Sequence, residues 1–263
     1  MNLARLYNRS AVSIAIASLA MASGCSTQPP STIETAEPLA SEQFADVPVC
    51  AITWKGAANS KHATVGVFLD NGEFRTAYHA MEMVTGSGLF LGTNLKAFLN
   101  GVPVVWKTVA SGKYNRNREM AEDWAELSIQ PRVVETGGMP FDFETPLPAG
   151  TRIFIVGFDD PKGNVSDNME MTGKRQVRSA SVIETPKDQA ESGANLNGVL
   201  FVKVDPPALR YGWSGSPALA EIDGKLKVIG TIINVNVQQK FLSSDIDWDR
   251  QNYAIVNRNG PKR

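Results

Sequence analysis

Short stretches of alternating or continuous apolar residues recur along most of the chain, and they predict β-strands. In the stretch 124–129, Ala125, Leu127 and Ile129 share one face, which is the period-two pattern of a half-buried strand. The pairs Asn71-Gly72 and Asp223-Gly224 predict tight hairpin turns. Helix is expected only as one turn after His79 and as a C-terminal segment at 248–256. Strands are expected at 47–54, 63–70, 73–79, 124–129, 152–158, 199–205 and 226–235.

A stretch rich in glycine and proline at 137–150 divides these strands into two groups. Two sets of short strands joined by such a linker indicate two packed barrels. We therefore expect an all-β fold of two packed antiparallel β-barrels, within a domain at 48–263. The barrels are expected at about 48–137 and 150–263.

The first 24 residues have the layout of a bacterial secretory signal, with Arg5 and Arg9 ahead of an apolar stretch. The sequence Ala22-Ser23-Gly24-Cys25 resembles a lipobox, in which the cysteine is lipidated and becomes the new N-terminus. Ala22 stands where the lipobox usually has leucine. We expect residues 1–24 to be a signal peptide of the lipoprotein type and Cys25 to be lipidated. Cleavage after Ala22, which would give a soluble periplasmic protein, is the first alternative. An uncleaved anchor is the weaker one, because the apolar stretch is short and broken by serines.

Residues 25–47 are rich in serine, threonine, proline and glutamate and lack hydrophobic periodicity. This composition predicts a disordered tether. Ser26 follows the cysteine where an aspartate would direct a lipoprotein to the inner membrane. The expected location is the periplasmic face of the outer membrane.

Composition excludes several classes of protein. The chain has 263 residues with 26 Lys and Arg against 27 Asp and Glu, and this balance gives no support for nucleic-acid binding. It has only two cysteines, Cys25 and Cys50, which excludes a disulfide scaffold or a cysteine-rich zinc protein. We expect Cys50 to be a small buried residue. Of the two histidines, His62 lies in a polar stretch and is expected to be exposed and non-catalytic.

Three short sequences carry groups suited to acyl transfer. A serine hydroxyl becomes an effective nucleophile when an imidazole takes its proton, and a buried acid holds that imidazole in one tautomer. The tetrahedral intermediate needs two backbone N–H donors, each worth about 3–4 kcal/mol of transition-state stabilisation. Gly212 permits a tight turn in which its own N–H and that of Ser214 point the same way. The three sequences are Thr76-Ala77-Tyr78-His79-Ala80, Asp123-Trp124-Ala125-Glu126-Leu127 and Gly212-Trp213-Ser214-Gly215-Ser216-Pro217.

Taken singly, each sequence is also typical of an ordinary histidine, a solvated strand end or a simple turn. Taken together, they resemble the T-A-x-H, D-x-A-x-L and G-x-S-G-x-P motifs of trypsin-like serine proteases with the chymotrypsin fold. The intervals are 44 residues from His79 to Asp123 and 91 from Asp123 to Ser214, and the likeness covers about residues 49–240.

The resemblance implies a double β-barrel with the active site between the barrels. It implies that His79 is the general base, Asp123 orients it, Ser214 is the nucleophile, and Gly212 and Ser214 form the oxyanion hole. The implied substrates are polypeptides, and no cofactor or metal is expected.

The same alignment indicates where this chain departs from the family. Trp213 stands where many members have an aspartate that pairs with a new N-terminus after zymogen cleavage, so we expect a site formed without that step. Ala208 aligns with the base of the primary pocket, and Ile233 and Val235 with one wall. Because no acid is present there, we expect cleavage after small or medium uncharged residues rather than after arginine or lysine.

The function predicted from the sequence is a lipid-anchored serine endopeptidase of the cell envelope. The alternative is a catalytically inactive binding lipoprotein of the same fold, which Trp213 would favour if its bulk distorted the oxyanion turn. An esterase with an α/β-hydrolase fold is disfavoured, because that fold orders its triad as serine, acid, histidine, and its nucleophile motif ends in glycine.

Overall fold

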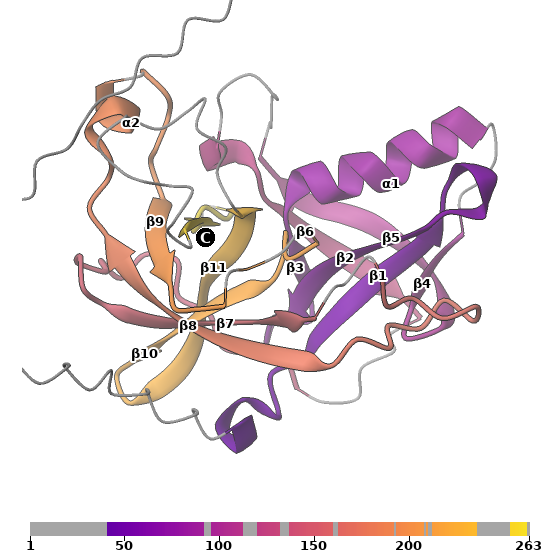
Figure 1. Ribbon diagram of the computed structural model, residues 1–263, viewed down its shortest axis with the longest axis horizontal. Helices are drawn as coiled ribbons and strands as arrows, with labels where there is room; N and C mark the ends of the chain where they lie inside the picture. Colours follow the sequence, from indigo (N-terminus) through magenta and orange to yellow (C-terminus); the bar gives the residue numbers. More distant parts are fainter. Residues whose placement is uncertain are drawn as a thin grey trace, which may run out of the picture. The chain divides into compact units, whose positions relative to one another are not determined.

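A computed structural model gives the structure of the protein, and all of its described residues belong to the unit Pro38–Arg263. The described residues are 41–91, 96–112, 120–131, 137–159, 163–191, 193–207, 209, 212–235 and 253–261. Two closed barrels of six strands each make up most of them (Figure 1). All pairings between the strands are antiparallel, so the predicted fold class is confirmed.

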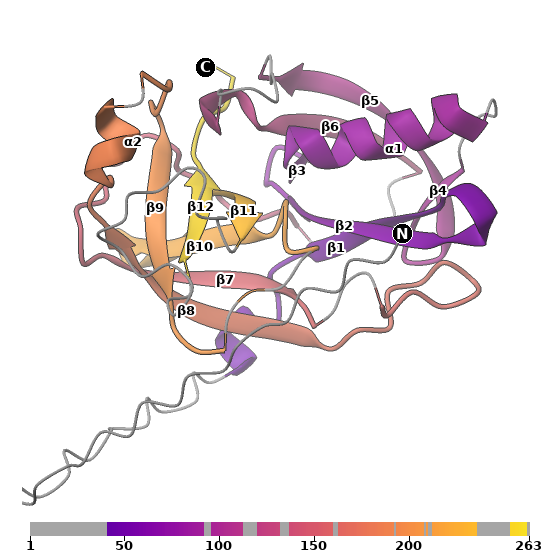
Figure 2. The same ribbon diagram turned by 45° about the horizontal axis from the view of Figure 1, so that its top comes forward.

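The first barrel has the strand order β1-β2-β3-β6-β5-β4. The helix α1 (Tyr78–Leu91) leaves the end of β3 and runs beside this barrel (Figure 2). Alternate residues point inward and form one apolar core that includes Ile52, Phe74 and Leu127. The strands are β1 (Val49–Lys55), β2 (Lys61–Phe68), β3 (Phe74–Thr76), β4 (Ala97–Leu99), β5 (Val102–Ser111) and β6 (Ala125–Gln130).

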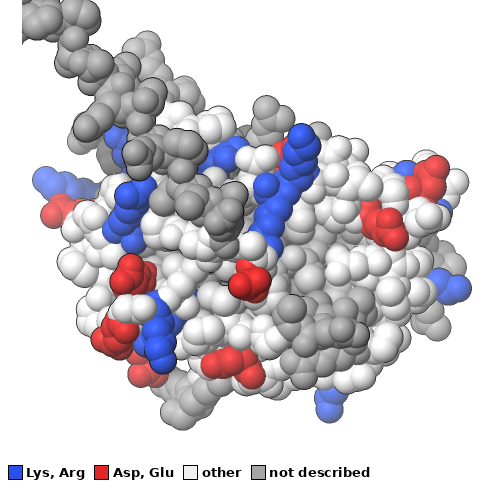
Figure 3. Space-filling model, turned by 90° about the horizontal axis from the view of Figure 1, so that it is seen from below, with Lys and Arg blue, Asp and Glu red and all other residues white. Residues whose placement is uncertain are grey.

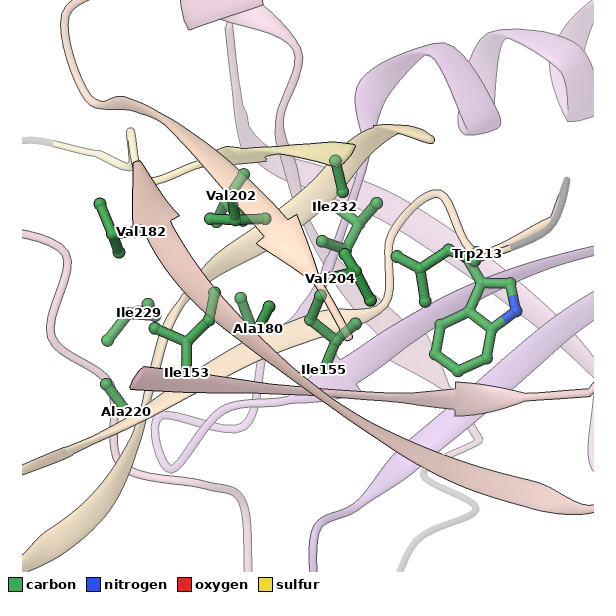
Figure 4. Packing of buried hydrophobic residues seen from close by; sticks show 14 of the residues in the cluster. Ile153, Ile155, Ala180, Val182, Val202, Val204, Trp213, Ala220, Ile229 and Ile232 are labelled. Atoms are coloured by element: carbon green, nitrogen blue, oxygen red, sulfur yellow. The ribbon is translucent and has the colours of Figure 1, made fainter. Parts of the chain in front are cut away.

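The second barrel has the strand order β10-β11-β12-β9-β8-β7. Its core is filled by branched aliphatic side chains and by Trp213 (Figure 4). A short helix, α2 (Lys187–Glu191), lies between β8 and β9. The strands are β7 (Arg152–Phe158), β8 (Arg175–Ile183), β9 (Val199–Val204), β10 (Pro217–Ile222), β11 (Lys225–Val235) and β12 (Tyr253–Asn257).

Two apolar clusters join the barrels. One combines Val65 and Val67 of β2 with Val156 of β7 and Leu219 of β10. The other combines Ala77 and Ala80 at the start of α1 with residues of β9, β11 and β12. The predicted linker adds to this contact, because Met139 bridges to Leu69 of the first barrel and Phe141 bridges to Val228 of the second.

Residues 41–47, which belong to the stretch whose composition predicts a disordered tether, are ordered and pack against the second barrel. A 3-10 turn covers Ser41–Phe44, and the side chains of Phe44 and Val47 are buried. The guanidinium of Arg175 donates hydrogen bonds to the carbonyl oxygens of Phe44, Ala45 and Val47. These bonds fix residues 41–47 against the second barrel.

Other expectations differ from the structure. The single turn predicted after His79 is a helix of 14 residues. Of the C-terminal segment predicted as helix, residues 253–256 belong to the strand β12, and residues 248–252 lie outside the described residues. The strands β4, β5, β8 and β10 are not among those that the sequence pattern predicts. His62 belongs to β2, where it is half-buried and stacks on Trp54 at 5.4 Å between ring centroids, so its predicted exposure is wrong.

Charged side chains of both signs are interspersed on the face shown in Figure 3, in keeping with the net charge of −1. None of the helices in the described part of the chain combines the length and apolar character needed to cross a bilayer.

Candidate active site

The pairing of β3 with β6 places His79 beside Asp123. Thr76 lies opposite Ala125 in this antiparallel pair, so the chain that leaves Thr76 runs alongside the chain that enters Ala125. Three residues beyond Thr76 the chain reaches His79, the second residue of α1. Two residues before Ala125 it reaches Asp123, which follows the 3-10 turn Met120–Glu122.

Two hydrogen bonds join the pair. The His79 ring lies 2.7 Å from Asp123, measured between Nδ1 and Oδ2, and the His79 backbone N–H donates to Oδ1 at 2.9 Å. The Asp123 side chain is 4% exposed and that of His79 is 23% exposed. A carboxylate that accepts from Nδ1–H favours the tautomer whose lone pair is on Nε2, which is the form a general base needs.

Asp123 also stabilises the start of α1. The first N–H groups of a helix have no acceptor within the helix, and a carboxylate near them is favoured by the helix dipole. The bond from the His79 N–H to Asp123 provides such an acceptor. The acid therefore positions both the backbone and the ring of His79.

Ser214 lies in a tight turn between Gly212 and Gly215, whose φ angles are +99° and +87°. Only glycine adopts such angles without strain. The Gly215 N–H donates to the carbonyl of Ile232 at 2.7 Å, and the Ser216 N–H donates to that of Trp213 at 3.0 Å. The turn is thus fixed to β11 of the second barrel.

The same turn is hydrogen-bonded to the first barrel through the carbonyl oxygen of Ser214. This oxygen accepts from the Val65 N–H at 3.4 Å and from the Thr64 hydroxyl at 3.3 Å. A Cβ added to Gly215 would collide with the Val65 carbonyl and the Thr76 hydroxyl. Since Thr76 is three residues before His79, the serine turn lies beside the strand that leads to the histidine.

The side chain of Trp213 lies at one end of the apolar cluster of the second barrel, beside β7 (Figure 4). It is 2% exposed. The indole lies against Gly157 of β7, where an added Cβ would be 2.7 Å from the ring, and the Arg178 guanidinium is 6.0 Å from its centroid. Glycine at position 157 provides the space for the bulk of the indole.

Of the predicted oxyanion donors, Gly212 and Ser214 both lie in the described turn. Among the described residues, no backbone carbonyl accepts a hydrogen bond from either N–H, whereas the next two N–H groups of the turn are both donors to the protein. Two N–H groups without a backbone acceptor are what an oxyanion hole offers to a substrate.

The predicted pocket residues are described only in part. Ala208 lies outside the described residues. Ile233 is 6% exposed and packs with Ala77 and Ala80, at a bulge where β11 shifts its register against β12. Val235 is the last residue of β11, and its side chain is not described.

Cys25 lies outside the described residues. Cys50 is a free, buried cysteine in the first barrel's core, as expected, and burial raises the pKa of its thiol to about 11. A thiol with this pKa is inert at neutral pH. In the described ranges there is no group of three or more His, Cys, Asp or Glu side chains that could hold a metal ion.

No family model matches the chain, and no curated protein matches it. Among solved structures, the scabies mite inactivated protease paralogue S-I1 is 13% identical with a TM-score of 0.52, over 80% of this chain and 89% of that one. The active form of the Rv3671c protease from M. tuberculosis is 15% identical with a TM-score of 0.47, over 90% of this chain and 89% of that one. Likeness at such low identity shows the fold alone, which is the two-barrel fold of chymotrypsin-type serine proteases.

Proposed function

We propose that the protein is a serine endopeptidase in which Ser214 is the nucleophile, His79 the general base and Asp123 the residue that orients His79. One observation carries this proposal. The two hydrogen bonds from His79 to Asp123 lie at the same junction of the barrels where the Ser214 turn is bonded to β2. In an unliganded enzyme the bond between nucleophile and base is often loose, and it tightens when substrate binds.

The proposed reaction uses only groups of this chain and water. Ser214 Oγ attacks the peptide carbonyl carbon while His79 Nε2 takes the hydroxyl proton, and the N–H groups of Gly212 and Ser214 stabilise the negative oxygen. The C–N bond then breaks, His79 gives its proton to the leaving amine, and an acyl-enzyme remains. Water attacks this ester as His79 takes its proton, and the bond to Ser214 breaks as the proton returns to the serine.

The placement of Trp213 supports activity over the inactive alternative. A bulky residue next to the nucleophile would favour an inactive protein if it forced the turn open. The indole is instead buried against Gly157, in the apolar cluster of the second barrel. The inactive binding protein remains the second candidate, and the first experiment separates the two.

That experiment labels the full-length protein with a fluorophosphonate probe. Wild type should be labelled, and Ser214→Ala and His79→Ala should each abolish labelling. Matched controls are Ser216→Ala, which removes a buried hydroxyl with no hydrogen-bond partner among the described residues, and His62→Ala, which removes the other histidine. Both controls should stay labelled. A folded wild type that is not labelled would contradict the peptidase proposal and support the binding protein.

Specificity follows from the pocket alignment. We infer that Ala208 at the base and Ile233 and Val235 on one wall select small or medium uncharged residues on the acyl side of the cleaved bond. The test is to incubate a mixture of denatured cellular proteins with this protein and to identify the released peptides by mass spectrometry. Products that end mainly in arginine or lysine would refute it.

We also propose that Cys25 carries a lipid that anchors the protein at the periplasmic face of the outer membrane. Metabolic labelling with a palmitate analogue should mark wild type and Cys50→Ser but not Cys25→Ser. In membrane fractionation, wild type and Cys50→Ser should be found with the membranes, and Cys25→Ser should not. Labelling that survives in Cys25→Ser would contradict the anchor, and an unlabelled periplasmic wild type would indicate cleavage after Ala22.

A further inference from the structure

The chain that follows β12 crosses from the second barrel to the turn that precedes Asp123 in the first (Figure 2). Asn257, the last residue of β12, is fully buried, and its Nδ2 donates to the carbonyl of Met120 at 2.6 Å. Two residues later, Asn259 Nδ2 donates to the carbonyl of Ala121 at 2.7 Å. Both bonds run from barrel 2 to barrel 1.

These two carbonyls belong to the 3-10 turn Met120–Glu122. A 3-10 turn has poorer hydrogen-bond geometry than an α-helix. Within this turn the Asp123 N–H reaches the Met120 carbonyl only at 3.3 Å, which is longer than either asparagine bond. The asparagine side chains therefore provide the shorter bonds at the backbone that carries the Asp123 carboxylate.

The asparagines are themselves held in place. The Asn259 N–H donates to Asn257 Oδ1 at 2.8 Å, and Asn259 Nδ2 also donates to the carbonyl of Asn197 at 2.6 Å. The N–H of Arg258 donates to the carbonyl of Gly198 at 2.6 Å, and the Arg75 guanidinium donates to the Asn259 carbonyl. The C-terminal segment is thus a fixed support for the turn.

We propose that Asn257 and Asn259 are positioning residues, which hold the Asp123 turn of the first barrel from the C-terminal end of the second. Neither residue touches the reacting atoms; each acts through Met120 or Ala121 on the carboxylate that orients His79. The activity readout rests on the proposed peptidase function, whereas the hydrogen-bond readout does not.

The test uses the full-length protein with Asn257→Leu, Asn259→Leu and the double variant. Leucine is close to asparagine in shape and cannot donate. The first readout is the low-field proton NMR resonance of His79 Nδ1–H, which reports the bond to Asp123. The second readout is kcat and KM for a peptide substrate, measured well below the melting temperature.

The matched control is Thr53→Val. It removes a buried hydrogen bond of the same kind, from Thr53 Oγ1 to the carbonyl of Met169 at 2.6 Å, away from the candidate site. We expect the double variant to lose or shift the His79 resonance and to lower kcat by about 10- to 100-fold with KM nearly unchanged, because small misplacements of catalytic groups have effects of this size. Thr53→Val should change neither readout.

A double variant with the wild-type resonance and kcat would overturn the proposal, and so would a wild type that lacks the resonance. A wild type that shows the resonance but hydrolyses nothing, with the resonance lost in the double variant, would refute the peptidase and leave the positioning role standing. Should the leucine variants fail to fold, Asn257→Asp and Asn259→Asp keep the volume, replace the donor by an acceptor and are measured in the same way. For them, too, an unchanged resonance overturns the proposal.

Discussion

Gly157→Ala offers a direct test of how the turn that carries Ser214 is supported. A Cβ at this position would lie 2.7 Å from two ring atoms of Trp213 and 2.8 Å from the Ser216 hydroxyl. Both neighbours belong to the turn around Ser214. Since contacts under 3.0 Å are not tolerated, either β7 or the turn must move.

The loss of folding stability in Gly157→Ala can be estimated from the crowding around the added methyl group. One extra methyl group in a well-packed core destabilises by about 1–3 kcal/mol. If the indole causes the crowding, its removal in Trp213→Leu should make the added methyl less costly. The double-mutant cycle should then give a coupling energy of about 0.5–3 kcal/mol between positions 157 and 213.

Two measurements check this on the full-length protein. Urea unfolding gives the free energies for the cycle, and the rate of fluorophosphonate labelling reports the geometry of the turn. Labelling of Gly157→Ala should slow by about 10-fold or more, because a displaced nucleophile is poorly aligned. The matched control is Gly137→Ala, where an added Cβ has no atom within 4 Å. Equal destabilisation by Gly157→Ala in both backgrounds would refute the reasoning.

Three further substitutions or reagents probe other contacts. Glu126→Ala removes the carboxylate that lies 3.3 Å from the buried Arg75 guanidinium, and it should lower the free energy of unfolding in urea by about 3–5 kcal/mol. The double variant Arg75→Met with Glu126→Leu removes both charges and should lower it by less. With the other cysteine replaced by serine, Cys50 should resist iodoacetamide at pH 8 until urea is added. Because burial raises the pKa of this thiol from 9.0 to about 11, its contribution to stability is intact below pH 9 and is lost as the pH rises through 11. Phe44→Ala should cost about 3–5 kcal/mol and expose residues 41–47 to limited proteolysis, whereas undiminished protection would refute the docking of this segment by Arg175.

The parts of the fold that the sequence predicts are those with local causes. The Asp223-Gly224 turn forms as expected, with φ angles of 53° and 69° that suit a two-residue hairpin loop. The strand β7 was predicted with its observed bounds because its apolar run is short and continuous. By contrast, β8 was missed because polar residues alternate irregularly with its few apolar ones.

The helix α1 was underestimated because its main causes are not local. Its sequence contains Gly86 and Gly88, which disfavour a helix by about 1 kcal/mol each. What starts the helix is the acceptor that Asp123 supplies from 44 positions away. What holds its first two turns is the burial of Met81 and Val84 on the barrel core.

The candidate site, too, has residues that the sequence predicts and residues that it does not. Residue types and their order were enough to single out His79, Asp123 and Ser214, and the register of β3 against β6 explains why the first two meet. The sequence does not predict a role for the two asparagines, because each acts through one side-chain hydrogen bond to a distant backbone carbonyl. Such bonds have neither a characteristic spacing nor a periodic pattern.

The contacts at the junction of the barrels have a consequence for how the site depends on the fold. The serine turn belongs to the second barrel but is bonded to Val65 of the first, and the Asp123 turn belongs to the first but is bonded to Asn257 and Asn259 of the second. Each barrel therefore fixes a turn of the other through backbone carbonyls. A shift of one barrel against the other would therefore displace Asp123 and Ser214 together. A change inside either core that leaves the junction intact would alter the site only through residues next to it. Gly157, which contacts Trp213 beside the nucleophile, is such a position.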